Sequence, residues 1–227
     1  MSVVRAVGFD LDGTLFDHRG SARAGVEEFF VRLGIEPSPA ARSRWFLAEE
    51  EQFERWRAGE IGFQEQRRER LRTVLPPLGV VIPSSPSGLD ELFGAYLRAY
   101  RAAWRVFPDS FDLLTSLRLS GYRVGILTNG SQEQQLDKLR TTGLLHALDV
   151  VCTSERLGTQ KPERQAFIAL ADELRTNPAS CLFVGDSPEH DVAGAQRVGM
   201  RTLLIDRYGT HAEGIASAVH AELASAL

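Results

Sequence analysis

Short apolar runs alternate with segments of helical periodicity over two separate parts of this chain, residues 1–15 and 106–206. Strands that alternate with helices form βαβ units and a mostly parallel sheet. We therefore expect an α/β fold with a Rossmann-like parallel sheet as its core. The predicted strands are Val3–Phe9, Arg123–Thr128, Val150–Thr153, Cys181–Val184 and Arg201–Ile205, and the predicted helices between them are Asp109–Ser120, Ser131–Thr142, Glu163–Leu174 and Val192–Val198.

The segment between these two parts has a different sequence pattern. Apolar residues recur there at helical spacing, and proline-rich stretches at 76–77 and 82–86 interrupt the pattern. This predicts an all-helical insertion, the cap, at 17–105, and an α/β core made of 1–16 and 106–227. A ligand site is favoured between a sheet edge and such an insertion. The predicted cap helices are Pro39–Arg57, Phe63–Leu75 and Gly88–Trp104, and a short amphipathic helix or a frayed end is expected at Glu213–Leu227.

The composition is that of an ordinary globular protein and argues against several functions. The chain has 227 residues, 43% of them apolar and 25% charged, with a formal net charge of −4. The charge composition has no excess of basic residues of the kind that binds nucleic acid. No signal-peptide pattern and no apolar run of membrane-spanning length occurs. Cys152 and Cys181 lie in apolar runs, as expected of core thiols in a reducing compartment. We expect a cytoplasmic protein without nucleic-acid or membrane partners, either a monomer or a homodimer.

The first predicted strand ends in two carboxylates. Asp10 and Asp12 follow the apolar run, and Gly13 and Thr14 then turn the chain. Ligands of open α/β sheets bind where strands end, and side chains two residues apart lean to the same side of a strand. Buried carboxylates require a cation or hydrogen bonds. The pair can be a metal-assisted aspartyl nucleophile with its acid/base partner, or an acidic strand-to-turn junction without chemistry.

Two later junctions offer groups that could bind an anion. Thr128, Asn129 and Gly130 place a hydroxyl and backbone N–H groups at a strand-to-helix turn, where the helix dipole favours anions; a helix cap is the alternative. Lys161 opposes the dipole at the start of a helix, which indicates pairing with carboxylates or phosphate unless the side chain is simply solvated. Lysine occurs only at Lys138 and Lys161, which sets both apart from the arginines that supply every other basic side chain.

A further buried strand delivers Asp186 and Asp191 to the same edge, because right-handed crossovers bring successive βα junctions together. Carboxylate oxygens suit Mg²⁺, which uses few protein ligands and keeps several waters. An acidic loop that caps the next helix is the alternative for Asp191, and His190 is expected to be a surface histidine rather than a ligand. The residues at these strand-to-helix junctions together predict one site at the carboxyl edge of the sheet.

This set of motifs resembles that of the haloacid dehalogenase-like hydrolases, in the phosphatase branch with a helical cap inserted after the first motif. The order and spacing match over nearly the whole chain. The motif set is specific for the family and says little about the substrate. The matching segments are Asp10–Thr14 for the first motif, Thr128–Asn129 for the second, Lys161 for the third and Gly185–Asp191 for the fourth.

The resemblance implies roles for the four carboxylates. Asp10 would attack phosphorus and form an aspartyl-phosphate. Asp12 would protonate the departing oxygen and then deprotonate the water that hydrolyses the intermediate. Mg²⁺ would be held by the Asp10 carboxylate, the Asp12 backbone carbonyl and Asp186, with Asp191 assisting directly or through water.

The same resemblance implies how the substrate is bound. Thr128 and Lys161, with the backbone around Asn129 and Gly130, would bind the transferring phosphoryl oxygens and stabilise charge in the transition state. The cap would close over the leaving group and set specificity, and Arg19 near its start would contact an anionic or hydroxylated substrate.

The expected activity is that of a Mg²⁺-dependent phosphomonoesterase acting on a nucleoside monophosphate or a sugar phosphate. Asp12 favours phosphate ester chemistry, since the dehalogenating branch of the family lacks an acid at this position. A sugar phosphomutase with the same nucleophile is an alternative, as is a non-catalytic metabolite-binding protein on the same scaffold.

Two features of the cap have simpler interpretations. The aromatic residues Trp45, Phe46, Phe53 and Trp56 recur at helical spacing. They could stack on a nucleobase, but a helix-packing core is favoured. The charged run at 67–70 is expected to be a solvated helix face.

Overall fold

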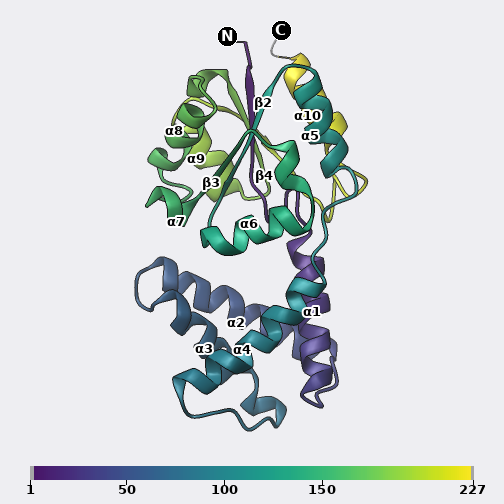
Figure 1. The fold of residues 1–227 in the computed structure, drawn as a ribbon, viewed down its shortest axis with the longest axis vertical. Helices are drawn as coiled ribbons and strands as arrows, with labels where there is room; N and C mark the ends of the chain where they lie inside the picture. The colour runs from purple at the N-terminus through teal and green to yellow at the C-terminus, as the bar shows by residue number, and fades with distance from the viewer. Residues whose placement is uncertain (1–2, 226–227) are drawn as a thin grey trace. The chain divides into compact units, whose positions relative to one another are not determined.

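The computed structural model describes residues 3–225, and the chain divides into two compact units (Figure 1). The first unit consists of Met1–His18 together with Trp104–Leu227, and the second of Arg19–Ala103. The chain therefore passes between the units after His18 and after Ala103, where the sequence places the breaks after residues 16 and 105. Among the described residues, no helix combines the length and the apolar character that a membrane crossing requires.

The first unit is built on a five-stranded parallel sheet with the strand order β3-β2-β1-β4-β5, which confirms the predicted α/β class. β1 lies at its centre and pairs with β2 on one side and β4 on the other. Because all the strands are parallel, their carboxyl ends meet at one edge. The strands are β1 (Ala6–Phe9), β2 (Arg123–Thr128), β3 (Val150–Thr153), β4 (Cys181–Gly185) and β5 (Arg201–Leu204).

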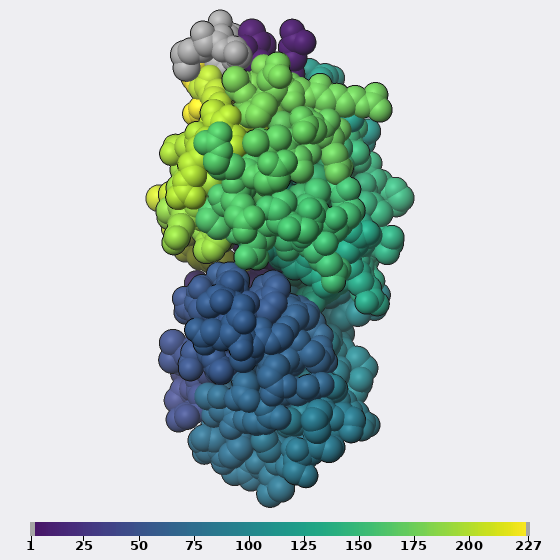
Figure 2. All heavy atoms as spheres, turned by 90° about the vertical axis from the view of Figure 1, so that its left-hand side faces the viewer, coloured from purple at the N-terminus to yellow at the C-terminus, as the bar shows by residue number. Residues whose placement is uncertain are grey.

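Helices cover both faces of this sheet. Figure 1 shows α7, α8 and α9 on one side of the sheet and α5 and α10 on the other. In the space-filling view of Figure 2, atoms of the green segments cover the side of the first unit that is turned to the viewer. The helices are α5 (Ser110–Leu119), α6 (Gln132–Thr141), α7 (Ser154–Leu157), α8 (Arg164–Glu173), α9 (Gly194–Gln196) and α10 (Ala216–Ala224), with short 3₁₀ turns at Leu144–Ala147 and Pro178–Ser180. The last two residues of the predicted segment Glu213–Leu227 lie outside the described part.

The core of the first unit forms between α8 and the sheet. Phe167 and Leu170 on α8 are buried against β-strand residues such as Phe183. Gly8 at the centre of β1 permits this contact, because a Cβ there would lie 2.6 Å from a methyl group of Leu170. The close packing of α8 fixes the strands whose ends carry the polar groups.

The first strand and the helix after β4 begin three or more residues away from their predicted starts. Sheet pairing of β1 starts at Ala6 rather than at Val3, and the Val3 side chain is 55% exposed. The helix predicted at Val192–Val198 begins earlier, as a π-helix over Pro188–Ala193 that continues into α9. This wider turn lies directly beside the acidic residues after β4, and π-turns are frequent at functional sites.

The second unit is a bundle of helices around an aromatic core. Trp45 is fully buried and lies 4.6 Å from Tyr96 between ring centroids, with Phe29 and Phe30 also in ring contact. Trp45 is therefore a packing residue, as the simpler interpretation held. The helices are α1 (His18–Arg32), α2 (Pro39–Arg57), α3 (Phe63–Val74) and α4 (Pro86–Ala102), with a 3₁₀ turn at Pro76–Leu78.

The charged run at 67–70 is not a solvated face, so that prediction was wrong. Arg70 is only 2% exposed; its Nη1 donates to Glu49 at 2.8 Å, and its guanidinium lies 5.5 Å from the ring centre of Trp45. Arg68 is bound in turn by Asp90. A guanidinium stacked on aromatic rings can enter a core when a carboxylate compensates its charge, and periodicity does not reveal this.

We predict that Arg70→Met lowers the free energy of unfolding by about 3 kcal/mol, because Glu49 keeps a largely buried charge without its partner. Arg72→Met is the matched control, since Arg72 is about a third exposed and its ion pairs contribute about 1 kcal/mol or less. Denaturant unfolding of both variants measures the difference. The double variant Arg70→Met/Glu49→Leu should recover most of the loss, and equal losses in Arg70→Met and Arg72→Met would contradict the assignment.

Candidate active site

Asp10 and Asp12 directly follow β1, at the centre of the sheet edge. Asp10 is 5% exposed, and its backbone N–H donates to the carbonyl of Val184, which continues the strand pairing. The hydroxyl of Thr14 donates to Asp10 Oδ2 at 3.0 Å. The turn from Gly13 onward thus folds back on Asp10 and fixes the orientation of its carboxylate.

Lys161 supplies the positive charge that faces Asp10. Its Nζ donates to Asp10 Oδ1 at 2.6 Å and to Asp191 Oδ1 at 2.7 Å, and the residue is 4% exposed. The side chain of Asn129 holds the Lys161 backbone from both directions, through hydrogen bonds of 2.9 Å to its carbonyl and from its N–H. Lys161 is therefore buried and paired rather than solvated, and Asn129 positions it.

Three carboxylates, those of Asp10, Asp186 and Asp191, gather within 4.8 Å of one another. Two glycines allow this approach. A Cβ at Gly13, where φ is +95°, would lie 2.2 Å from Asp186 Oδ2, and a Cβ at Gly185 would lie 2.3 Å from Asp191 Oδ2. Any larger residue at either position would displace a carboxylate from the cluster.

The electrostatics of this cluster fit a divalent cation. The ammonium of Lys161 contacts two of the three carboxylates, those of Asp10 and Asp191. Burial, together with the negative charges of Asp191 and Asp186, raises the pKa of Asp10 to about 8 against the attraction of Lys161. Burial and the charge of Asp191 likewise raise the pKa of Asp186 to about 6. Hard oxygen donors in charge excess are the ligand set that Mg²⁺ prefers, so the residues present fit this ion.

The side chain of Asp12 lies outside this cluster and is held by helix α6. Lys138 Nζ donates to both of its carboxylate oxygens, at 2.6 and 2.8 Å, and Gln135 Nε2 donates to Oδ2 at 2.9 Å. Burial raises the pKa of Asp12, but Lys138, His18 and Gln135 outweigh it and lower the pKa to about 2. The carboxylate of Asp12 is consequently held in its ionised form.

The groups predicted to bind phosphate differ in whether their donors already form hydrogen bonds within the protein. Thr128 is 1% exposed, and its hydroxyl oxygen accepts a hydrogen bond from Gln135 at 2.6 Å, which leaves the hydroxyl proton free to be donated. The backbone N–H of Gly130 donates to Ser154 Oγ at 2.9 Å. That N–H would have to leave Ser154 before it could bind a phosphoryl oxygen.

The first unit thus assembles the sequence-predicted site residues other than Arg19 at one sheet edge. Arg19 belongs to the second unit, so its role toward the substrate stays a prediction. Gln135 and Lys138, the two α6 side chains that hold Asp12, had no role predicted from the sequence. The scarcity of lysine was the signal that could have found Lys138.

The family pattern described as haloacid dehalogenase-like hydrolase matches residues 4–199. A ribulose-1,5-bisphosphate 5-phosphatase of Halopiger xanaduensis is 30% identical over 88% of this chain and 84% of its own length. A glyceraldehyde 3-phosphate phosphatase of Methanopyrus kandleri is 29% identical over 90% and 85% of the two chains.

Solved structures show the same fold. A hydrolase of this type from Bacillus subtilis, bound to magnesium, superposes with a TM-score of 0.78 at 21% identity, over 92% of this chain and 90% of that one. A defluorinating L-2-haloacid dehalogenase superposes with a TM-score of 0.71 at 26% identity, over 93% and 84%. The fold is therefore shared by enzymes of more than one activity.

We predict that Mg²⁺ raises the melting temperature, and raises it more at pH 8 than at pH 5.5. The raised pKa values of Asp10 and Asp186 mean that these groups bind protons more tightly in the folded protein than in the unfolded chain. Their contribution to stability therefore falls as pH rises from about 4 toward 8, while the ionised carboxylates that would bind Mg²⁺ become available. Thermal unfolding with and without Mg²⁺ measures the rise in melting temperature. Asp186→Asn should reduce it and the exposed control Asp112→Asn should not; an undiminished gain in Asp186→Asn would contradict the site.

We also predict that Lys138→Met raises the pKa of Asp12 above its present value of about 2, because burial remains while the ammonium is lost. The lowered pKa of Asp12 contributes stability that is present above about pH 4 and disappears as pH falls toward 2. Lys138→Met should cost about 2 kcal/mol of unfolding free energy at pH 7, and less as pH falls below 4. Carboxyl-carbon NMR titration of the metal-free protein gives the pKa, with the exposed Arg140→Met as control. An unchanged Asp12 pKa in Lys138→Met would refute the assignment.

Proposed function

Because the chain belongs to the haloacid dehalogenase-like hydrolase family, we propose that it is a Mg²⁺-dependent phosphomonoesterase that acts on small phosphorylated metabolites. The observation that carries the proposal is the buried Asp10 carboxylate. It is oriented by Thr14, paired with Lys161, and placed beside two further carboxylates that fit a divalent ion. A carboxylate fixed in this way is suited to attack an electrophile that carries negative charge, which is what a phosphate ester presents.

Asp10 is the proposed nucleophile. An oxygen of its carboxylate forms a bond to phosphorus while the bond from phosphorus to the ester oxygen breaks, which leaves an aspartyl-phosphate. The Asp10 carboxylate, the Asp12 backbone carbonyl and Asp186 would hold Mg²⁺, with Asp191 assisting directly or through water. This ion would supply the charge that offsets repulsion between the carboxylates and the phosphate. Lys161 adds positive charge at the same point. Its ammonium has a third N–H in addition to the two donated to Asp10 and Asp191, and this one can bind a phosphoryl oxygen.

Asp12 is the proposed acid and base. It protonates the departing oxygen and then removes a proton from the water that attacks the aspartyl-phosphate. The contacts with Lys138 and Gln135 favour the ionised form, which is the form required in the second step. The acid step requires Asp12 to carry a proton, so we expect its carboxylate to loosen its contact with Lys138 when the substrate is bound.

Thr128 and Lys161 would bind the phosphoryl oxygens and stabilise the charge of the transition state, as fixed donors in a buried site do. Asn129 contributes by holding Lys161 through the backbone. The second unit would act as the cap, with Arg19 as a contact to the substrate. The two relatives act on ribulose bisphosphate and glyceraldehyde 3-phosphate, which supports a sugar phosphate as the substrate class.

We expect a panel of phosphorylated metabolites to release orthophosphate in the presence of Mg²⁺, with turnover abolished by EDTA. Asp10→Asn should lower kcat by about a thousandfold or more, because an amide is a poor nucleophile. Asp112→Asn, which removes an exposed carboxylate on α5, is the control and should keep full activity. An acid quench during turnover should trap one phosphate on the wild-type chain and none on Asp10→Asn.

Three results would contradict the proposal. Hydrolysis that persists in Asp10→Asn would remove the nucleophile assignment. Interconversion of phosphate isomers with little released orthophosphate would indicate a phosphomutase. Halide release from haloacids without phosphatase activity would indicate a dehalogenase.

A further inference from the structure

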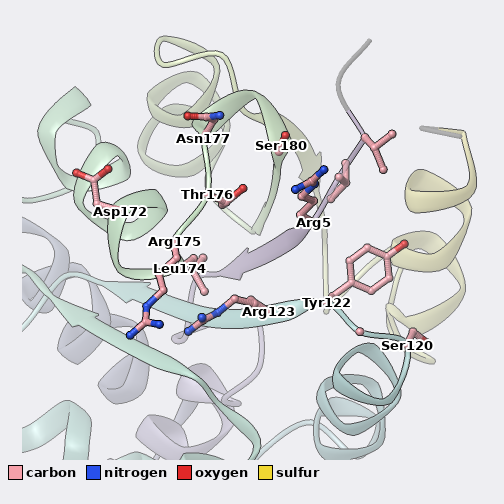
Figure 3. Close-up of a pocket in the computed structure, with 13 residues that line it drawn as sticks. Arg5, Ser120, Tyr122, Arg123, Asp172, Leu174, Arg175, Thr176, Asn177 and Ser180 are labelled. Atoms are coloured by element: carbon pink, nitrogen blue, oxygen red, sulfur yellow. The ribbon is translucent and has the colours of Figure 1, made fainter.

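We propose that the first unit binds a multiply charged, phosphate-bearing anion at a second place, a groove of about 1130 Å³ on the amino edge of the sheet (Figure 3). This amino-edge groove is formed by the segments that lead into β1, β2 and β4. Its lining consists of Val3–Arg5, Ser120–Arg123, Asp172, Leu174–Asn177 and Ser180.

The groove is separate from the candidate active site. Arg5 immediately precedes β1 and Asp10 immediately follows it, so the strand lies between the two. Five residues of extended chain span roughly 17 Å at about 3.3 Å each. An anion in the groove therefore does not reach the carboxylate cluster, and its binding is independent of the proposed phosphatase activity.

Charge is the first argument for an anion. Arg5, Arg123 and Arg175 line the groove, and Asp172 is its one acidic lining residue. Within residues 3–225, none of these three arginines forms an ion pair, whereas Arg207 in the same unit is paired with Asp109 at 2.6 Å. Figure 3 shows the side chains of Arg123 and Arg175 ending at neighbouring positions in the view, with the Arg5 side chain apart from them on the segment that leads into β1. Three positive charges collected in one groove against a single carboxylate favour an anionic ligand.

The second argument is an uncompensated buried donor. Arg123 is half-buried, and its Nε has no hydrogen-bond partner among the described residues. A guanidinium nitrogen removed from water without a partner is costly, and such groups in native structures require an explanation. An anion bound to the outer nitrogens of Arg123 would supply the missing compensation through its charge.

The third argument is the backbone of Arg175, which has a φ of +54°. Arg175 follows the end of α8, and the next N–H, that of Thr176, returns to the carbonyl of Ala171 at 3.0 Å. This is the left-handed helix end at which glycine is the usual residue. Among residues 3–225, Arg175 is the only non-glycine residue with positive φ. Backbone strain that the chain retains is concentrated at functional positions, and here it brings a third guanidinium to the groove.

The lining also indicates which anion fits. Guanidinium groups bind phosphate through two parallel hydrogen bonds, and three of them match a ligand with more than one phosphate group. Hydroxyl groups of Ser120, Tyr122, Thr176 and Ser180 add further donors. A polyphosphate chain, free or as part of a nucleotide, is the chemistry that this lining would recognise.

Isothermal titration of the whole chain with inorganic tripolyphosphate in EDTA tests the proposal, because without metal the carboxylate cluster repels the probe. We expect one site per chain, with affinity that falls as salt is added. The triple variant Arg5→Gln/Arg123→Gln/Arg175→Gln should bind roughly tenfold or more weakly. The triple variant Arg140→Gln/Arg164→Gln/Arg197→Gln, which removes the same charge from exposed positions elsewhere, and Thr128→Val, at the catalytic edge, should bind like the wild type. The proposed anion site would be overturned if both triple variants lost the same affinity for tripolyphosphate, if Thr128→Val lost affinity, or if the wild type did not bind.

Arg175→Gly separates binding from folding. Glycine relieves the left-handed conformation, so the melting temperature should rise while the affinity for tripolyphosphate falls. A more stable variant with unchanged affinity would remove Arg175 from the site.

Discussion

The contact between the Lys161 ammonium and the carboxylates of Asp10 and Asp191 is the interaction on which the rest of the site depends. All three groups are almost fully buried, and a buried carboxylate without a cation is strongly destabilising. Lys161 makes it possible to place Asp10 and Asp191 beside each other, yet one ammonium leaves the three-carboxylate cluster negatively charged. That remaining charge gives the cluster its affinity for a further cation and makes Asp10 chemically distinct from a surface aspartate.

The parallel sheet explains why residues so distant in sequence can meet. Asp10, Lys161 and Asp191 are separated by 151 and 30 positions, yet Asp10 directly follows β1, and Lys161 and Asp191 lie in the segments that follow β3 and β4. Right-handed crossovers impose this arrangement on every βαβ unit. The carboxylates of Asp186 and Asp191 can come this close only because Gly13 and Gly185 leave room that a Cβ would fill. Topology therefore brings the groups to one edge, and two glycines let them make contact.

The fold was largely predictable from sequence because four of its strands, β1 to β4, are largely buried on both faces. Such strands appear as short apolar runs, and β2 and β3 begin and end where the sequence places them. Most of the motif residues were found because they follow a strand end, and Lys161 because it stands at the start of a helix. Gln135, Lys138 and Arg70 were missed for a common reason. Each is a polar helix residue whose partner, Asp12 or Glu49, lies in another element, and helical periodicity carries no information about that partner.

The two lysines of the chain show why side-chain shape matters in this site. Arginine provides all the other basic side chains, including the buried Arg70, so positive charge alone does not require lysine. An ammonium is a compact point charge with three rotatable donors, whereas a guanidinium is a planar fork that fits a single carboxylate. Lys161 must reach two carboxylates that already lie close together, and Lys138 must reach both oxygens of Asp12 from beside the ring of Phe16. The task of Lys161 requires the smaller and more adaptable cation. The contact of Lys138 is with one carboxylate, which a guanidinium fork also fits, so side-chain shape accounts for Lys161 alone.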